Sequence, residues 1–314
     1  MSTYLVTGGA GFIGSHLCHA LVNRGDTVRV LDDLSTGRRS NLPAAANLIV
    51  GDVADPAIVA EAIDDVDGCF HLAAIASVEQ GVIDWLGTHR ANITGAITVF
   101  DAIRRQGRRI PVVYASSAAV YGEAATIPIA ESEPCVPLSA YGADKHACEL
   151  HARVAGHVHG IPTVGLRLFN VYGPRQDPKS PYSGVISIFC DRILGGRPIA
   201  IYGDGQQTRD FIYVGDVVAA LTAGMALPAD PSGMNARVFN ICSGKATSVQ
   251  ALARLIAELA GRKVRMDWQP LRSGEIRHSL GVPVLGDRVL GLSGRMPLRS
   301  GLRHVLAWMA GAEV

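Results

Sequence analysis

The feature that most constrains the fold is a glycine-rich turn near the amino terminus, where Gly8, Gly11 and Gly14 recur at every third position. It follows an apolar run at residues 3–7, typical of a strand, and opens a helical pattern from Ser15 to about Arg24. A tight turn into a helix lets backbone amides approach a pyrophosphate. The spacing differs from the commoner G-x-G-x-x-G, but the strand-turn-helix context predicts a dinucleotide-binding unit.

The end of the second predicted strand, at 27–31, indicates which dinucleotide is bound. Asp32 and Asp33 follow it at about the distance where an acid binds the adenosine ribose hydroxyls and repels a 2′-phosphate. Arg38 and Arg39 follow soon after and would favour NADP, because an arginine can accommodate the 2′-phosphate. Asp32 ends the strand itself, so we give it more weight and expect NAD rather than NADP. A third strand, at 47–50, leads to Asp52, a candidate acceptor for the adenine amine.

Strands and helices then continue to alternate with short connections. The predicted elements are helices at about 56–63, 85–104 and 140–158 and strands at 68–72, 110–117 and 164–169. This order predicts an α/β fold, a Rossmann-type doubly wound parallel sheet. We assign residues 1–170 plus about 211–242 to this first domain.

The character of the chain changes after residue 170. Residues 176–184 are rich in Pro, Gly and polar residues and predict a loop. We expect helices at about 185–195, 248–260 and 299–310, short strands at 199–202 and 264–268, and a loop at 203–210. About 171–210 plus 243–314 therefore form a smaller, discontinuous α/β substrate domain, whereas 211–214, the helix from Asp216 and strand 237–241 return to the first domain.

Tyr141 and Lys145 are four residues apart and open an apolar-periodic run, so they share one face of a helix. A free tyrosine titrates near ~10 and is a poor base. A lysine ammonium within a few ångströms favours the phenolate, which can accept a proton from an alcohol. Ser117 ends the buried strand at 110–117, and its hydroxyl can hydrogen-bond the same alcohol oxygen.

Composition excludes several classes of function. A net charge of +1 gives no electrostatic case for binding nucleic acid or an anionic membrane. We find no apolar run approaching ~20 residues and no signal peptide. The six cysteines form no C-x-x-C pair and the ten histidines no H-E-x-x-H, so we expect no metal site and a reducing, cytoplasmic location.

The predicted helices at 85–104 and 140–158 carry apolar residues on more than one face. We expect part of each to pack against another subunit in a homodimer. Burial within one chain explains the pattern equally well.

Several motifs occur in the order of a known family: Gly8–Gly14, Asp52-Val53, Ser116-Ser117 with Val120-Tyr121-Gly122, Tyr141-x-x-x-Lys145, Arg167-Leu-Phe-Asn170 and Arg209–Asp216. With them the chain resembles the extended short-chain dehydrogenase/reductases, and more narrowly the nucleotide-sugar 4-epimerases typified by UDP-glucose 4-epimerase. The resemblance covers nearly the whole chain.

The resemblance implies an isomerase that inverts C4 of a UDP-hexose, UDP-glucose or UDP-galactose. Tyr141 takes the proton of the 4-hydroxyl, Lys145 assists it and holds the nicotinamide ribose, and Ser117 binds the reacting oxygen. Transient oxidation gives a 4-keto sugar, whose other face then receives the hydride. NAD is regenerated in each cycle and can remain tightly bound.

The resemblance also implies binding residues. The cofactor contacts are Gly8, Gly11, Phe12, Ile13, Gly14, Asp32, Asp33, Ser35, Thr36, Gly37, Asp52, Val53, Leu72, Ala73, Ala74, Asn92, Tyr141, Lys145 and Phe169. The UDP-sugar contacts are Ser117, Asn170, Tyr202, Arg209, Arg272, Glu275 and Ser279. Two arginines on one diphosphate, Arg209 and Arg272, would make bidentate charge-assisted contacts.

Three departures from the family bear on specificity. Ala76 replaces a lysine that touches the cofactor in some members. Ser279 stands where galactose-specific bacterial enzymes carry a bulky tyrosine, and the small residue leaves room beside the sugar 2-position, so the substrates can include UDP-N-acetylglucosamine and UDP-N-acetylgalactosamine. Residues 281–298 differ from the usual helical tail.

Rival functions remain open. Sugar-nucleotide dehydratases carry an Asp-Glu pair where this chain has Ala118 and Ala119, which cannot exchange a proton. A UDP-glucuronate 4-epimerase would need a cation for the C6 carboxylate, for which Arg192 or Lys179 is a candidate. A catalytically silent nucleotide-sensing protein would tend to lose Tyr141 or Lys145, and a dehydrogenase would release NADH.

Overall fold

The computed structural model describes residues 1–180, 183–228, 236–271 and 276–312. Its main body is a seven-stranded sheet in the order β10-β6-β5-β4-β1-β2-β3, in which every neighbouring pair is parallel. Its strands are β1 (Thr3–Thr7), β2 (Thr27–Asp32), β3 (Asn47–Val50), β4 (Gly68–His71), β5 (Val112–Ser117), β6 (Thr163–Leu168) and β10 (Ala236–Ile241). The predicted Rossmann-type sheet is confirmed.

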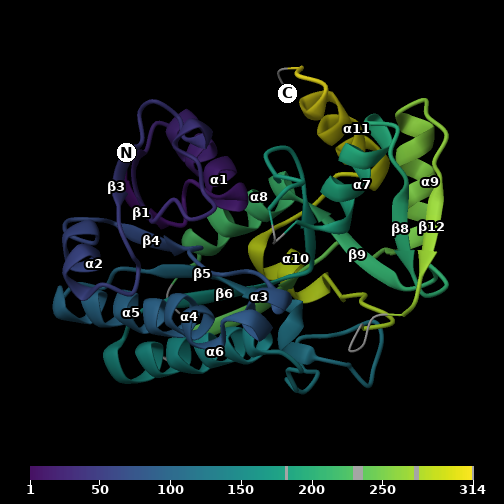
Figure 1. Ribbon diagram of the computed structural model, residues 1–314. Coiled ribbons are helices and arrows are strands. Elements are labelled where there is room, and N and C mark those ends of the chain that lie inside the picture. The colour runs from purple at the N-terminus through teal and green to yellow at the C-terminus, as the bar shows by residue number, and fades with distance from the viewer. Residues whose placement is uncertain (181–182, 229–235, 272–275, 313–314) are drawn as a thin grey trace.

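Helices cover both faces of this sheet (Figure 1). On one face lie α2 (Pro56–Ala62), α5 (Gly95–Arg105) and α6 (Ala140–His159), with α3 (Val78–Ile83) and α4 (Trp85–His89) packed against α6. On the other lie α1 (Phe12–Asn23), α8 (Val214–Met225) and α10 (Val284–Leu290). Each face buries its own apolar cluster, as a parallel sheet requires.

A smaller body lies beside the carboxyl ends of the main strands (Figure 1). It contains a three-stranded sheet in the order β11-β9-β7, a two-stranded sheet of β12 and β8, and three helices around one apolar cluster. The elements are β7 (Asn170–Tyr172), α7 (Val185–Leu194), β8 (Ile199–Tyr202), β9 (Thr208–Tyr213), β11 (Ala246–Ser248), α9 (Val249–Leu259), β12 (Met266–Gln269) and α11 (Leu298–Met309).

Local chemistry explains where the key helix lies. The hydroxyl of Ser139 accepts a hydrogen bond from the backbone N–H of Gly142 and caps the amino terminus of α6. Gly160, in the left-handed conformation, ends it. Tyr141 is therefore in the first turn and Lys145 in the second, on the face turned toward the sheet.

The predicted helix at 85–104 is confirmed, because the backbone is helical without a break from Trp85 to Arg105; it comprises α4, a π-helical turn η2 (Arg90–Thr94) that the sequence did not predict, and α5. Other predictions were wrong. Residues 208–210, predicted as loop, begin β9, because their hydrogen-bond partners β7 and β11 lie far away in the sequence. β9 therefore does not join the seven-stranded sheet, whereas β10 pairs with β6 in it. The predictions also missed α3, α10, β7 and β11.

Among the helices in the described ranges, none combines the length and apolarity that crossing a bilayer requires.

Candidate functional site

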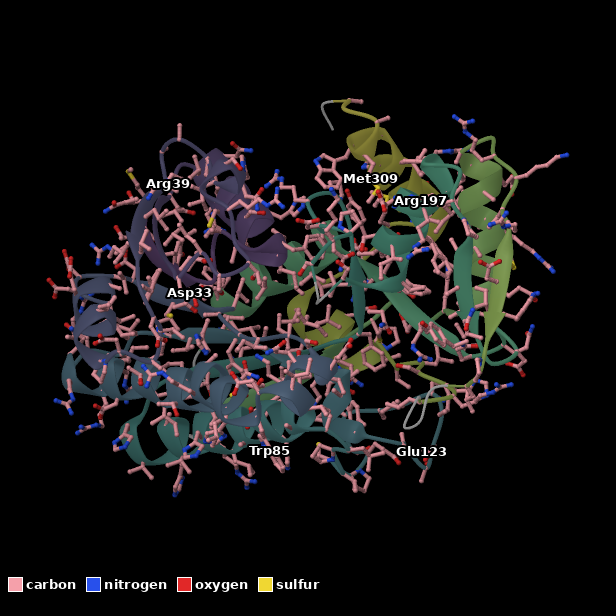
Figure 2. The ribbon with its side chains drawn as sticks, in the orientation of Figure 1. Asp33, Arg39, Trp85, Glu123, Arg197 and Met309 are labelled. Atoms are coloured by element: carbon pink, nitrogen blue, oxygen red, sulfur yellow. The ribbon has the colours of Figure 1, made fainter. Side chains whose placement is uncertain are left out.

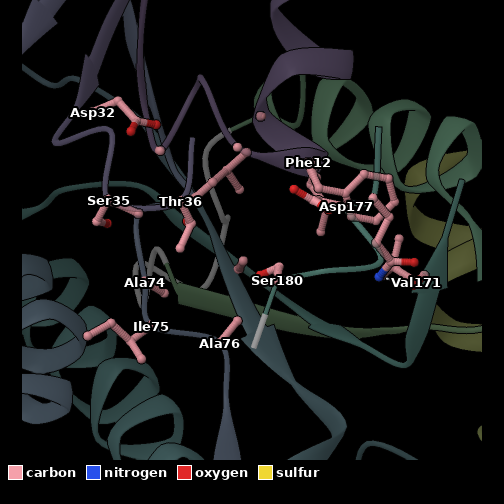
Figure 3. Close-up of a pocket in the computed structure, with 18 of the residues that line it drawn as sticks. Phe12, Asp32, Ser35, Thr36, Ala74, Ile75, Ala76, Val171, Asp177 and Ser180 are labelled. Atoms are coloured by element: carbon pink, nitrogen blue, oxygen red, sulfur yellow. Dashed lines mark hydrogen bonds between the residues drawn. The ribbon is translucent and has the colours of Figure 1, made fainter. Parts of the chain in front are cut away.

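A cavity of about 680 Å³ opens at the carboxyl ends of the main strands. The chain order reverses there, because β2 and β3 lie on one side of β1 and β4 lies on the other. Ligands of open α/β sheets bind in this crevice. Figure 3 shows Asp32, Ser35 and Thr36 along one side of the cavity, Ala74–Ala76 along another, and Phe12, Val171 and Asp177 opposite.

The glycine turn forms one wall through close backbone packing. Gly8 has a φ of +69°, and a Cβ added there would lie 2.6 Å from the backbone nitrogen of Ala73, which follows β4. A Cβ on Gly14 would lie 2.2 Å from the carbonyl oxygen of Gly8. The turn and the first residues of α1 therefore form a tight cradle of backbone, in which amides can face a pyrophosphate.

Asp32 is buried at the end of β2, and each of its carboxylate oxygens accepts one backbone hydrogen bond. The donors are the N–H groups of Ala10 and Leu34, both at 2.9 Å. Burial raises the pKa of Asp32 above its usual value, and the two hydrogen bonds oppose that rise. A Cβ on Gly37 would lie 2.8 Å from the same carboxylate. One lone pair on each oxygen is left, enough for a pair of ribose hydroxyls.

Asp52, after β3, is held by Arg90. The guanidinium nitrogens lie 2.8 and 3.2 Å from one carboxylate oxygen, and the N–H of Ala54 lies 2.7 Å from the other. Partial burial acts to raise the pKa of Asp52, but these contacts outweigh it and the pKa is lowered. Asp52 is therefore a charged acceptor at the edge of the cavity.

Ser117, Tyr141 and Lys145 line the same cavity as the glycine turn. The Lys145 ammonium is buried, donates to the carbonyl of Ala115 at 2.9 Å and lies 6.0 Å from the centroid of the Tyr141 ring. The hydroxyl oxygen of Ser117 accepts from the N–H of Ala119 at 3.1 Å, which leaves its proton for another acceptor. These three groups can bind and deprotonate an alcohol.

Beneath the cavity, Thr7 fixes the tautomer of His71. The Thr7 hydroxyl oxygen accepts from the N–H groups of Leu72 and Ala73, both at 3.2 Å, so its one proton goes to Nδ1 of His71 at 2.8 Å. Burial and the charge of Lys145 lower the pKa of His71 to about 3. The imidazole is therefore neutral, and Lys145 is the cation on this side.

Most of the expected cofactor residues line the cavity: Gly8, Gly11, Phe12, Ile13, Gly14, Asp32, Asp33, Ser35, Thr36, Asp52, Val53, Leu72, Ala73, Ala74, Tyr141, Lys145 and Phe169. Gly37 and Asn92 do not. The buried amide of Asn92 instead bonds the backbone N–H of Ile75 at 2.8 Å and its carbonyl at 3.2 Å. It therefore supports a segment that lines the cavity.

The expected UDP-sugar residues divide between two places. Ser117 and Asn170 line the cavity, whereas Tyr202, Arg209 and Ser279 do not. Ser279 pairs through its backbone N–H with the carbonyl of Thr208 at 3.1 Å, so the 279 segment and β9 lie side by side. Arg272 and Glu275 lie outside the described residues.

The sequence did not predict the wall formed by Arg175–Asp177 and Ser183–Gly184, nor the contribution of Trp308 from α11. This wall is tied to the glycine-turn side: Arg38 forms an ion pair with Asp177, and His16 bonds the carbonyl of Pro174 at 2.9 Å. The Pro- and Gly-rich composition of 176–184 indicated a loop, but nothing in it indicated what the loop contacts.

One trio in the described residues, Cys135, His146 and Glu149, offers potential metal-ligand atoms within 4.8 Å of one another. Both oxygens of Glu149 already accept hydrogen bonds from Arg167, at 2.9 and 2.7 Å. A cation would therefore have to displace a guanidinium, so the trio does not have the character of a metal site.

Comparisons with known proteins agree with this geometry. A model of the NAD dependent epimerase/dehydratase family matches residues 4–242. A putative UDP-glucose 4-epimerase of Methanocaldococcus jannaschii is 36% identical over 306 residues, covering 97% of both chains. The crystal structure of Thermotoga maritima UDP-glucose 4-epimerase with UDP-glucose has a TM-score of 0.93 and 33% identity, covering 98% of this chain and 99% of that one.

A second solved structure is similar to the same extent. It is the UDP-N-acetylglucosamine 4-epimerase from Methanobrevibacter ruminantium M1 in complex with UDP-N-acetylmuramic acid. Its TM-score is 0.92 at 35% identity, and the match covers 99% of this chain and 98% of that one.

Proposed function

The chain belongs to the NAD-dependent epimerase/dehydratase family, and from that membership we propose that it inverts C4 of a UDP-hexose, interconverting UDP-glucose and UDP-galactose. It is a UDP-sugar 4-epimerase with NAD as its cofactor. The observation that carries the proposal is that Ser117, Tyr141 and Lys145 share one cavity with the glycine cradle. The cradle fits NAD, because side chains at Gly8 and Gly14 would collide with backbone where a pyrophosphate has to approach.

Each residue has a defined part in this mechanism. Tyr141 takes the proton of the sugar 4-hydroxyl, and the positive charge of Lys145 stabilises the phenolate. Ser117 donates its hydroxyl proton to the reacting oxygen and holds it in place. NAD, when bound, supplies a reversible acceptor for the C4 hydride, so the cofactor is regenerated and stays tightly bound. The residues then return the proton to the oxygen on the inverted carbon.

The positions of the carboxylates favour epimerisation over dehydration. Ala118 and Ala119, next to Ser117, carry no acid. Asp32, Asp33 and Asp52 line the cavity from the ends of β2 and β3, and β4 and β1 lie between these strands and β5. Strand spacing therefore separates Asp32 and Asp33 from Ser117 by roughly 14 Å and Asp52 from it by roughly 19 Å. Asp177, on the opposite wall, forms an ion pair with Arg38. Elimination of water needs an acid near the sugar, whereas C4 epimerisation needs none beyond Tyr141.

The range of sugars is part of the proposal. The resemblance implies that a small residue at position 279 leaves room for an N-acetyl group, although Ser279 does not itself line the cavity, and a UDP-N-acetylglucosamine 4-epimerase is among the similar structures. We therefore include UDP-N-acetylglucosamine. Neither of the two cations suggested for the carboxylate of UDP-glucuronate, Arg192 and Lys179, lines the cavity, and Arg192 donates to the carbonyl of Pro198.

We propose a homodimer formed through α3, α4 and α6. Large apolar side chains on these helices are exposed: Val82, Ile83, Trp85, Leu86, Leu150, Val154 and Val158. α3 and α4 pack against α6, and Figure 2 shows Trp85 at the edge of the molecule on this side. Exposed apolar side chains on helices that pack together indicate a binding face. A monomeric mass at micromolar concentration in light scattering would contradict this proposal.

We also propose the division of labour between the two bodies. The main body, predicted as residues 1–170 plus about 211–242, binds NAD, and the smaller body, predicted as about 171–210 plus 243–314, binds the nucleotide sugar. In the structure β9 belongs wholly to the smaller body and α10 packs on the main sheet. A cytoplasmic location is supported by the six cysteines, all of which are free thiols.

The test uses the purified protein without added cofactor. It is incubated separately with UDP-glucose, UDP-N-acetylglucosamine and UDP-glucuronate, and the C4 epimers are resolved by the NMR signals of their anomeric protons. We expect epimers from the first two substrates. Tyr141→Phe should retain NAD and lose activity, which separates an enzyme from a nucleotide sensor. No epimer from any sugar after NAD is added, or net release of NADH, would contradict the proposal.

A further inference from the structure

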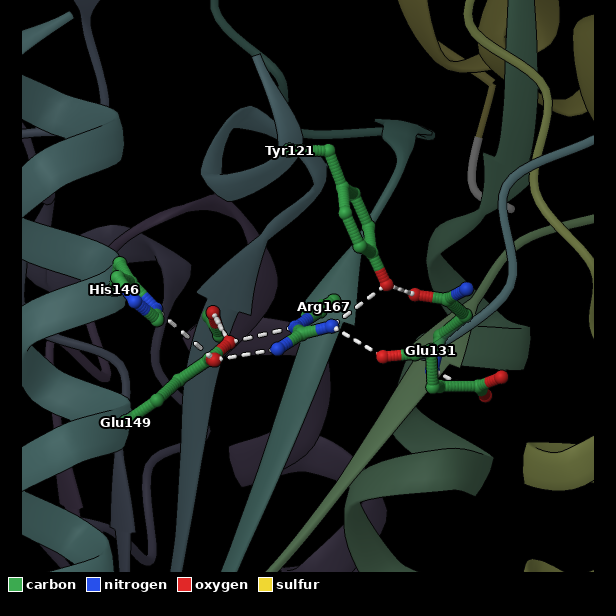
Figure 4. A network of polar contacts seen from close by, with 7 residues as sticks. Tyr121, Glu131, His146, Glu149 and Arg167 are labelled. Carbon is green, nitrogen blue, oxygen red and sulfur yellow. Dashed lines mark hydrogen bonds and ion pairs between the residues drawn. The ribbon is translucent and has the colours of Figure 1, made fainter. Parts of the chain in front are cut away.

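A buried ion pair joins α6, the helix of Tyr141 and Lys145, to β6 (Figure 4). Glu149 on α6 and Arg167 on β6 are each 7% exposed, and the guanidinium donates to both carboxylate oxygens, at 2.9 and 2.7 Å. The hydroxyl of Ser116 donates to one of the same oxygens at 2.5 Å. Ser116 is the direct neighbour of Arg167 in the parallel pairing of β5 and β6.

This ion pair holds helix and strand in register at the catalytic residues. Tyr141, Lys145 and Glu149 follow at intervals of four and share the sheet-facing side of α6. Lys145 bonds the carbonyl of Ala115, and Glu149 bonds the hydroxyl of Ser116, so consecutive turns of the helix are tied to consecutive residues of β5. Ser117 is the next residue along that strand.

The contacts continue from Arg167 toward the smaller body. Its third nitrogen donates to the hydroxyl of Tyr121 at 2.8 Å, and that hydroxyl donates to the side-chain oxygen of Asn240 at 2.6 Å. The amide nitrogen of Asn240 donates to the carbonyl of Ile129 at 3.0 Å.

Ile129 then joins the segment that carries Ser279. Its backbone N–H donates to the carbonyl of Leu280, and its carbonyl accepts from the N–H of Val282, both at 2.8 Å. An unbroken series of hydrogen bonds therefore connects the strand of Ser117 with the segment that we propose borders the sugar.

We propose that Glu149 and Arg167 are positioning residues for the reaction: they set the placement of Ser117, Tyr141 and Lys145, and through Tyr121 and Asn240 they fix the 279–282 segment relative to that group. The inference rests on the proposed function. Neither Glu149 nor Arg167 lines the cavity, so both act on the reaction through the positions of the residues that do.

Neutralising one partner leaves the other as a buried, uncompensated charge, which must move or take up water. Glu149→Gln does this at the catalytic end, because the amide cannot accept from Arg167 on both sides. Tyr121→Phe acts only at the other end, because it removes the hydroxyl between Arg167 and Asn240 and keeps the ring. The two variants should therefore affect different kinetic constants.

In the wild-type background, Glu149→Gln should lower kcat about 10- to 100-fold, the usual penalty for misplacing reacting groups by up to an ångström. KM for the UDP-sugar should stay within about twofold of the wild-type value, and so should the amount of NAD that remains bound to the purified protein. Tyr121→Phe should raise KM about fivefold and change kcat by less than about twofold. Glu258→Gln, which breaks the exposed pair with Arg299, is the matched control and should change neither constant.

Ser116→Ala replaces Glu149→Gln in this test if Glu149→Gln does not fold. It removes the hydrogen bond from the Ser116 hydroxyl to Glu149 and keeps the ion pair between Glu149 and Arg167. It should lower kcat by about threefold or more with KM unchanged. The inference would be overturned if the folded variants, Glu149→Gln or Ser116→Ala, kept the kcat of the wild type. It would also be overturned if kcat fell only in parallel with the NAD content and the folded fraction of the protein.

Amide hydrogen exchange separates this inference from the proposed function. Residues 112–118 and 140–149 should exchange faster in Glu149→Gln than in wild type or in Glu258→Gln, whether or not any sugar is turned over. If the wild type epimerises no UDP-sugar, the proposed function fails and exchange alone decides the positioning role. Unchanged exchange in both segments would overturn it.

Discussion

Gly14→Ala should abolish NAD retention even though it improves the local helix. Gly14 is the third residue of α1, where alanine is favoured over glycine by roughly 1 kcal/mol. Helix propensity alone would therefore predict a harmless or stabilising substitution. The structure predicts a harmful one, because the added Cβ would lie 2.2 Å from the carbonyl oxygen of Gly8 and 2.7 Å from the Cα of Gly9. Both are backbone atoms, so no side-chain rotation relieves the overlap and the turn itself has to move.

The magnitude follows from what the turn does. If its displacement removes two charge-assisted hydrogen bonds from backbone amides to the pyrophosphate, each costs about 1.5–3 kcal/mol. The total of roughly 3–6 kcal/mol weakens NAD binding by about 10²- to 10⁴-fold. The gain in helix propensity does not offset a loss of this size, because it stabilises the folded chain with or without the cofactor.

Gly11→Ala is the matched control from the same turn. Its added Cβ would have one neighbour within 4 Å, the carbonyl oxygen of Gly8 at 3.3 Å, and its φ of −75° suits any residue. We expect a loss below about 1 kcal/mol, or less than about fivefold in affinity.

The assay measures NAD released by acid from each purified variant, followed by calorimetric titration of the stripped protein. Circular dichroism confirms that both variants fold. The reasoning is refuted if Gly14→Ala carries stoichiometric NAD, or if Gly11→Ala loses as much NAD as Gly14→Ala.

Two further predictions concern the walls of the cavity. Asp177→Asn breaks the exposed ion pair with Arg38 that ties the wall of Arg175–Asp177 and Ser183–Gly184 to the glycine-turn side. NAD should therefore dissociate up to about fivefold faster, as it should from the wild type at high salt. Rapid dilution into an NAD-consuming trap measures the rate of dissociation, and equal rates in the variant and the wild type would contradict the prediction. For His71, burial and the charge of Lys145 lower the folded-state pKa to about 3, whereas the unfolded chain takes up that proton near 6.5. The stability contributed by the neutral imidazole is complete above pH 6.5 and is lost as the pH falls toward 3, by about 1.4 kcal/mol per pH unit. Burial also lowers the pKa of His16, to about 4, so His16 adds a slope of its own in this pH range. Urea unfolding at pH 7 and pH 5 should therefore show a slope that is shallower in His71→Asn, which can still accept from Thr7, than in the wild type, by up to about 1.4 kcal/mol per pH unit; identical slopes would show that His71 does not contribute.

Local pattern was sufficient to predict that most of the expected cofactor residues lie together. The glycine turn, Asp32 and the Tyr141–Lys145 pair are each defined by short spacing at the end of a strand or the start of a helix. Parallel strands end at the same edge of a sheet, so residues after β1, β2 and β5 had to meet. That geometry is why these residues line one cavity.

The other wall could not be predicted by the same means. Trp308 reaches the cavity from α11, and Arg175 and Asp177 reach it from a loop whose composition indicates only irregular structure. The smaller body is built from short strands whose partners lie far away in the sequence, such as β7 against β9 and β8 against β12. A three- or four-residue strand has too little periodicity to be recognised without its partner.

The Glu149–Arg167 pair lies between these two cases. The spacing argument that joined Tyr141 to Lys145 can be extended by one more turn to Glu149, which the sequence analysis did not single out, and it puts a carboxylate on the sheet-facing side of α6. A carboxylate buried there requires a cation, since an unpaired charge in the interior is very costly. Arg167, on the predicted strand at 164–169, was a cation within the family motif that ends that strand. What the sequence lacked was the register, because only the pairing of Ser116 with Arg167 brings both to the same turn of α6 and makes the ion pair part of the catalytic framework.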